Sequence, residues 1–405
     1  MQETQEREAR SGVLGRMPTW VSGIAPLLLL AALVWIFLAY GPLGVFQAAF
    51  PPVEELSIQR IVLPEPEVIQ VEIVNGGPDP VTVDQVLVDE AYWVHTIEPA
   101  RTIPRLGRAT ITSPYAWVEG DTHEIMLITE TGVTFTGEIA VATVSPKPNA
   151  LYLTTFTLLG IYVGVIPVGI GLLWYPFLRR IKRRWMDFFL AFTVGLLLFL
   201  GVDAVVEALE LAGERVPGPF QGEALILIGG LGTFLALDAF VRWTKSGVRD
   251  ETRARLVLAY LIALGIGLHN LGEGLAIGAA YAVGEIALGG FLVLGFMIHN
   301  TTEGLAIVAP IAKDRPARLL GHLAAMGALA GGPTIVGTWI GGFTYSPIWA
   351  VFFLSVGAGA IFQVVYEIGK LMRQQSDDSA SRLLNVAGLM AGLVIMYVTG
   401  LLVTA

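Results

Sequence analysis

The chain has 405 residues, of which 54% are hydrophobic and 15% charged, with a formal net charge of −9 and a mean hydropathy of +0.66. This composition is typical of a membrane protein and excludes an ordinary soluble enzyme, and the acidic balance indicates no nucleic-acid partner. The chain contains no cysteine, which excludes thiolate metal sites and disulfides.

The first predicted element is a membrane helix at Val21–Tyr40. This apolar run is longer than the core of a signal peptide, and it lacks a small-residue cleavage site. We therefore predict that residues 1–50 form a cytoplasmic tail and an uncleaved anchor helix.

Residues 51–148 predict a small extracytoplasmic β-sandwich. Stretches such as Val68–Val74, Val81–Val88 and Phe135–Val144 alternate and are rich in β-branched residues, and Asn75–Pro78 has the composition of a turn. Residues 52–148 hold fifteen acidic and five basic residues, a net charge of −10. This charge indicates either a solvated acidic surface or weak attraction of external cations.

Residues 149–405 contain eight further apolar runs, each about long enough to cross the ~30 Å hydrocarbon core of a bilayer. These runs are Leu151–Leu178, Met186–Val206, Ala224–Val241, Leu256–Val283, Ile286–Ile311, Leu319–Ile340, Ile348–Met372 and Leu383–Ala405. The predicted fold is therefore a polytopic α-helical membrane protein with an eight-helix bundle, one N-terminal helix and a β domain.

The distribution of Lys and Arg predicts the orientation in the membrane. Basic residues gather in alternate connections, at Arg179–Arg184, Arg242–Arg255, Lys313–Arg318 and Lys370–Arg382, whereas the other short connections hold only Arg215. We predict a multi-pass protein of the cell (inner) membrane, with a cytoplasmic N-terminus and an extracytoplasmic β domain and C-terminus.

Charges inside the predicted spans are all acidic. The six residues are Asp203, Glu207, Asp238, Glu273, Glu303 and Glu367, and every Lys and Arg is assigned to the tail, the β domain or a connection, with Lys370 at the end of Ile348–Met372 counted in the connection that follows. A carboxylate without a basic partner in a helix bundle must be protonated, face water or bind a cation. This pattern favours cation handling. Asp203, Glu207, Asp238 and Glu367 are candidate pathway residues, with a hydrogen bond between helices as the alternative.

The most specific pattern is a polar cluster that occurs twice. His269, Asn270 and Glu273 precede Gly-Leu-Ala, and His299, Asn300 and Glu303 repeat this arrangement 30 residues later. Residues four apart lie about 40° from each other on a helix, so each cluster shares one face. Imidazole and carboxylate groups are suitable ligands for zinc and related divalent metals.

The spacing also predicts that the clusters meet. They lie on consecutive, antiparallel spans joined near Gly284–Glu285, each about 12 to 17 residues from that turn and therefore near mid-membrane at ~1.5 Å per residue. We expect the other histidines, His95, His123 and His322, to have surface or hydrogen-bonded roles.

Read as HNxxEGLA in two successive helices, the clusters resemble the fourth and fifth helices of the ZIP family of divalent metal transporters, particularly its bacterial gufA-like branch. The resemblance covers residues 151 to about 405, and Gly357–Glu367 is similar to the family's seventh helix. It implies a binuclear site. His269, Glu273, His299 and Glu303 would hold one metal. Asn270 and Asn300 would serve the second, with the glutamates bridging.

The sequence also departs from the family pattern. Gly272 and Thr302 replace the proline that precedes each glutamate, and His299–Asn300 occupies a position that usually holds Gln or Asp. Gly332–Pro333 stands where the sixth helix normally adds a glutamate, and the loop Arg242–Arg255 is short and basic rather than histidine-rich.

The resemblance implies a non-enzymatic importer of zinc, or of iron, manganese or cadmium, with the lipid bilayer as its environment and a homodimer as one candidate assembly. Two alternatives stay open from the residues alone. An intramembrane zinc hydrolase would need a further ligand and a general base, and the HExxH spacing is absent. A metal sensor or scaffold would use the β domain as its working part.

Overall fold

A computed structural model describes residues 19–40, 53–245, 250–283, 286–373 and 379–404. The chain divides at Pro52 into two compact units, which are considered separately. The first contains helix α2, Thr19–Tyr40, where the anchor helix is predicted. The predicted turn at Gly284–Glu285 lies outside the described residues.

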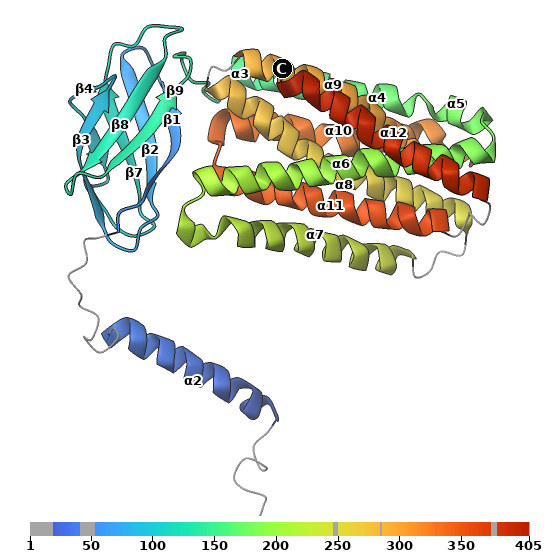
Figure 1. The fold of residues 1–405 in the computed structure, drawn as a ribbon, viewed down its shortest axis with the longest axis horizontal. Helices are drawn as coiled ribbons and strands as arrows, with labels where there is room; N and C mark the ends of the chain where they lie inside the picture. Colours follow the sequence, from blue (N-terminus) through green and yellow to red (C-terminus); the bar gives the residue numbers. More distant parts are fainter. Residues whose placement is uncertain (1–18, 41–52, 246–249, 284–285, 374–378, 405) are drawn as a thin grey trace, which may run out of the picture. The chain divides into compact units, whose positions relative to one another are not determined.

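The second unit begins with two antiparallel sheets (Figure 1). One has the order β1 (Leu56–Val62), β2 (Val68–Asn75), β7 (Arg108–Pro114) and β5 (Thr96–Glu98). The other has the order β4 (Ala91–Tyr92), β3 (Val81–Val88), β8 (His123–Thr129) and β9 (Thr134–Ile139), and β6 (Thr102–Ile103) pairs with β3.

Both sheets contribute to one apolar core, as the alternating sequence predicts. Ile69, Val71 and Ile73 of β2 are buried together with Ile125 and Leu127 of β8. Successive side chains of a strand point to opposite faces, so this periodicity places every second residue inside. The predicted β domain is confirmed.

Helices form the rest of the unit. They are α3 (Ala150–Gly160), a π-helical turn (Ile161–Val165), α4 (Ile166–Leu172), α5 (Tyr175–Arg180), α6 (Arg183–Arg215), a 3₁₀ turn (Gly218–Phe220), α7 (Gly222–Lys245), α8 (Glu251–Ala282), α9 (Ile286–Val308), α10 (Leu319–Thr344), α11 (Pro347–Arg373) and α12 (Ser379–Thr404). The long helices run side by side in one bundle (Figure 1).

Within the described residues, seven helices are long and apolar enough to cross a membrane. They coincide with seven of the nine predicted spans. The first and sixth predicted spans contain shorter apolar helices, Ile24–Ile36 and Leu292–Val308, in the part of the chain that was described.

Glycine brings α8 and α10 into close contact. A Cβ atom at Gly274 would lie 2.2 Å from the Thr334 carbonyl oxygen, and one at Gly337 would lie 2.2 Å from that of Leu271. Small residues let membrane helices approach to backbone contact, where dispersion forces hold them without a hydrophobic driving force. This tight pair carries much of the polar cluster described below.

Two of the carboxylates in the predicted spans have basic partners, which corrects the expectation of unpaired acids. Helix α7 extends beyond its predicted span and carries Arg242, whose Nε lies 2.7 Å from Asp238 Oδ2. Within α11, Lys370 Nζ lies 2.9 Å from Glu367 Oε1. Long basic side chains near helix ends extend along the helix to such groups. The sequence count missed these pairs because it treated both bases as loop residues.

Candidate metal centre

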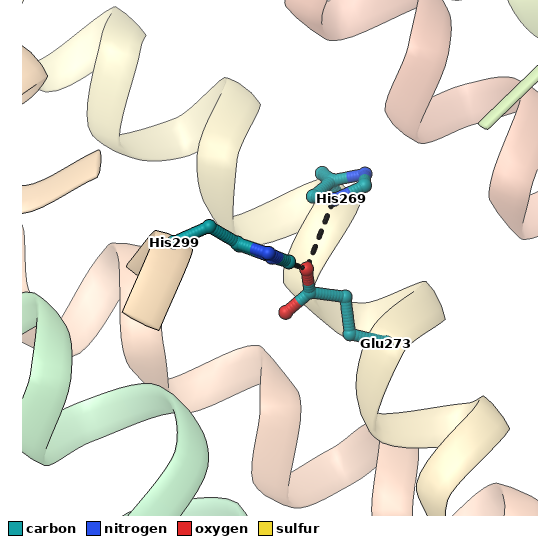
Figure 2. A group of neighbouring side chains, drawn as sticks. All are labelled: His269, Glu273 and His299. Atoms are coloured by element: carbon teal, nitrogen blue, oxygen red, sulfur yellow. Dashed lines mark hydrogen bonds and ion pairs between the residues drawn. The ribbon is translucent and has the colours of Figure 1, made fainter. Parts of the chain in front are cut away.

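Three of the predicted ligands meet in the helix bundle (Figure 2). His269 and Glu273 come from α8, and His299 comes from α9. His269 Nε2 lies 3.2 Å from Glu273 Oε1, and His299 Nε2 contacts the same oxygen. One ligand atom from each residue lies within 4.8 Å of the other two, and all three residues are buried.

The Glu273 carboxylate is held from both sides. Its Oε1 faces the two imidazoles, and its Oε2 accepts a hydrogen bond of 3.1 Å from Asn300 Nδ2. Asn300 itself is completely buried. The repeated cluster on α9 thus supplies one ligand and also fixes the carboxylate of α8.

Glu303 is the fourth predicted ligand, and its contacts differ from those of Glu273. Its Oε2 accepts a hydrogen bond of 3.2 Å from Asn270 Nδ2, while its Oε1 has no partner among the described residues. The two clusters therefore cross over: the amide of each copy donates to the glutamate of the other. The repeat in the sequence therefore appears in the structure as two equivalent hydrogen bonds between α8 and α9.

Four buried oxygen atoms around this crossing have no hydrogen-bond partner among the described residues. They are Asn270 Oδ1, Asn300 Oδ1, Glu303 Oε1 and Thr334 Oγ1. Buried polar atoms are nearly always satisfied, so a group of unsatisfied acceptors calls for an occupant such as water or a cation. Amide, hydroxyl and carboxylate oxygens all suit a cation.

Thr334 of α10 was not found from the sequence. Most threonines of the helices, such as Thr301 and Thr399, donate to the carbonyl four residues earlier. The carbonyl four residues before Thr334 belongs to Ala330, and it accepts a hydrogen bond of 3.2 Å from Asn270 Nδ2 instead. The Thr334 hydroxyl therefore lies beside the cluster with its hydrogen-bonding capacity unused.

The π-helical turn is the second missed feature, and a proline explains it. Pro167 lacks the N–H that would donate to the carbonyl four residues earlier, which belongs to Val163. Val163 O accepts instead from Asn300 Nδ2 at 3.0 Å. A Cβ at Gly164 would lie 2.2 Å from Thr334 Oγ1, so this turn packs directly against Thr334 of α10. The presence of Pro167 inside the predicted span Leu151–Leu178 could have indicated this irregular turn from the sequence.

Gly332 stands where the family pattern has a glutamate, and it does not pack against another side chain among the described residues. A Cβ atom there would meet nothing within 4 Å. Thr334 is fully buried and is the polar side chain that α10 presents beside the turn.

Asp203 and Glu207 of α6 lie near the centre. Asp203 lies within electrostatic range of His269 and His299, and Glu207 lies within electrostatic range of Glu273. Both α6 side chains are exposed. Asp238 and Glu367 are ion-paired, as described above.

The remaining histidines have hydrogen-bond partners. His95 Nδ1 lies 3.2 Å from Trp93 O, His322 Nδ1 lies 2.9 Å from Tyr260 OH, and His123 Nδ1 lies 2.7 Å from Asp89 Oδ2. These contacts agree with the hydrogen-bonded roles predicted for them.

Asp89 also affects the titration of its neighbours. Burial raises the pKa of Asp89, but hydrogen bonds from His123, Tyr115 and the Glu124 N–H outweigh this effect, so the net pKa is lowered. The hydrogen bond to Asp89, together with burial, raises the pKa of Tyr115 to about 12.

Fold and site together define the class: a multi-pass helical membrane protein with a buried His₂Glu group and an attached β domain. No known protein-family profile matches the chain. It is 30% identical over 140 residues to the zinc transporter ZIPB of Bordetella bronchiseptica. The match covers 33% of this chain and 45% of that protein, so the chain spans about half the length of this curated relative.

Proposed function

We propose that the helical domain is a ZIP-like transporter that moves a divalent transition metal, foremost zinc, toward the cytoplasm. The supporting observation is the convergence of His269, Glu273 and His299 on one buried point, because two imidazoles and a carboxylate are a common zinc ligand set. The partial similarity to a zinc transporter points in the same direction.

The buried group explains how a cation can leave water. Stripping a divalent ion of its hydration shell requires ligands that replace those waters, and Glu273 also supplies a negative charge. The imidazoles bind metal only when neutral, so metal and protons compete for the same nitrogens. We assign the unpartnered oxygens of Glu303, Asn270, Asn300 and Thr334 to a second, all-oxygen position beside the first.

Asp203 and Glu207 line the approach to this centre. Both side chains are exposed and lie within electrostatic range of the ligand residues, so we assign them to the route by which a cation approaches the imidazoles. Their role is to attract the ion, and the buried group holds it.

The transporter proposal is preferred to a zinc hydrolase or a sensor. A hydrolase needs an activated water and a separate general base, whereas Glu273, the carboxylate within the described triad, is already shared between both histidines. Uptake of ⁶⁵Zn²⁺ into sealed vesicles without release of a hydrolytic product separates these classes.

The decisive variant is Glu273→Gln, which keeps the shape of the side chain and removes its charge. Removing one partner of a buried charged pair costs about 3–5 kcal/mol, so zinc affinity and uptake should fall at least ~100-fold. Glu210→Gln, on the exposed part of α6, is the matched control and should behave as the native chain. Native uptake by a well-expressed Glu273→Gln protein would refute the proposal.

A further inference from the structure

Strand β1 contacts the ends of two bundle helices. Arg60 Nη1 donates to Phe343 O in the last turn of α10 at 2.7 Å, and Ser57 Oγ donates to Arg215 O at the end of α6 at 3.2 Å. Carbonyls in the last turn of a helix have no partner within that helix, and the helix dipole makes them attractive to a cation. The strand thus satisfies groups that every helix end leaves free.

The loop after α6 contributes two more contacts. Gly218 N donates to Glu55 Oε1 at 2.9 Å. A Cβ at Gly76, in the turn after β2, would lie 2.7 Å from Pro217 Cβ, so only glycine permits this approach.

The connection to the first bundle helix is also ordered. Leu63 N donates to Ser145 Oγ at 2.9 Å, and Ser145 N donates to Leu63 O at 2.8 Å. Asn149 then caps α3 by accepting from Tyr152 N. The β domain is held at this position by its connection as well as by the contacts of β1.

A cavity of about 720 Å³ lies between these parts. Strands β1 and β9 form one wall, and the ends of α6, α8 and α10 form the other. We call it the β1 chamber. Its charged lining residues are Glu55, Arg60, Glu138, Glu214 and Arg215. Both arginines are close to helix ends, and Arg60 donates to a helix carbonyl.

Three acidic residues lie on one side of α6. Asp203, Glu207 and Glu214 are spaced by four and seven residues and so share a side of the helix. Glu214 lines the chamber, and Glu207 lies within electrostatic range both of Tyr345, another lining residue, and of Glu273 of the centre.

We propose that the β domain is a fixed wall of the chamber through which the cation reaches the metal centre, and that Glu138 and Glu214 concentrate the cation there. The inference rests on the proposed transport function. It gives the domain a defined effect: the chamber sets uptake at low metal concentration, while the buried ligands set the maximum rate and the binding stoichiometry. Confined carboxylates raise local cation concentration in this way.

A cross-link tests the fixed position, since the cysteine-free chain is a clean background. Gly76→Cys combined with Pro217→Cys brings two Cβ atoms to 2.7 Å, closer than the ~3.8 Å of a disulfide, so the two loops must separate by only about 1 Å for the bond to form. We expect rapid oxidation to an intramolecular bond in membranes, with uptake retained. Lack of a bond in a folded double variant, or a bond that abolishes uptake, would overturn the fixed wall.

The double variant Glu138→Gln, Glu214→Gln tests the effect on the cation. At low ionic strength the apparent KM for zinc should rise about threefold or more with the maximum rate unchanged, and the difference should vanish near 1 M salt, where screening acts within ~3 Å. Glu98→Gln on β5 is the control.

Zinc binding by the purified double variant separates this inference from the proposed function. Zinc binding should be unchanged in the double variant and lost in Glu273→Gln. An unchanged KM in the double variant would refute the chamber, while native binding by Glu273→Gln would refute the centre.

Discussion

At the scale of single residues, the centre depends on which polar atoms are satisfied. Glu273 uses both carboxylate oxygens, whereas Glu303 uses one. The Glu273 carboxylate is therefore held in place before metal binds, whereas one oxygen of Glu303 is available as a ligand. Thr334 adds a hydroxyl with no competing partner among the described residues.

Thr334→Val tests the second position. Valine keeps the shape and removes the oxygen, and a hydrogen bond or ligand contact to a charged group contributes about 1.5–3 kcal/mol, so the weaker of two zinc affinities should fall ~10- to 100-fold. Calorimetric titration of the purified protein measures both. Thr399→Val, whose hydroxyl bonds within its own helix, should change neither. Unchanged binding in Thr334→Val would leave the hydroxyl without a role at the site.

We expect Asp89 to make the stability of the β domain depend on pH. Because its folded pKa is lowered, its contribution to stability is present above the unfolded pKa and is lost as pH falls through the folded value. Asp89→Asn should lower the thermal midpoint of the domain by about 2–5 °C at neutral pH and have little effect in strong acid. Hydrogen exchange of the β8 amides, measured at increasing temperature, gives the midpoint of unfolding of the domain. Asp84→Asn is the control and should not change this midpoint. A pH-independent difference would contradict the electrostatic cause.

At the scale of elements, backbone contact between α8 and α10 positions the donors. Asn270 on α8 reaches Ala330 O on α10 because glycines remove the side chains that would separate the helices. The π-helical turn completes the arrangement from a third side.

Gly278→Ala should disrupt this contact. The new Cβ would lie 2.3 Å from Thr338 O and 2.7 Å from Gly342 N, both backbone atoms that cannot rotate away. Overpacking of this kind costs about 1–3 kcal/mol. The midpoint of thermal aggregation in detergent should fall. Gly369→Ala, where a Cβ meets nothing within 4 Å, should not lower it. Equal midpoints would mean that the helices can separate freely.

At the scale of the whole molecule, orientation decides what the β domain does. The basic loops predict that it faces outward, and the proposed chamber requires this if metal moves inward. The orientation stays a prediction, as do the cell (inner) membrane location and a homodimeric assembly.

Cysteine labelling tests the orientation. In right-side-out vesicles, Glu130→Cys in the β domain should react with a membrane-impermeant maleimide, whereas Arg253→Cys at the start of α8 should react only after permeabilisation. Both positions are exposed, so access alone decides the outcome. The reverse pattern would place the domain in the cytoplasm.

The sequence by itself determined the local features. Alternation defined the β strands, long apolar runs defined the bundle helices, and a polar cluster repeated after 30 residues identified His269, Glu273 and His299 as groups that meet. Each of these follows from a periodicity along the chain, either two residues per strand repeat or 3.6 per helical turn. Such periods need no knowledge of neighbouring elements.

Only the tertiary structure decided the partners. It joined Asn270 to Glu303 and Asn300 to Glu273, paired Asp238 with Arg242, brought Thr334 beside the cluster and set Arg60 against the end of α10. These contacts depend on how far each helix extends, how it is rotated and where glycine allows close approach. Pairs such as Arg60 and Phe343, 283 residues apart, leave no periodic trace in the sequence.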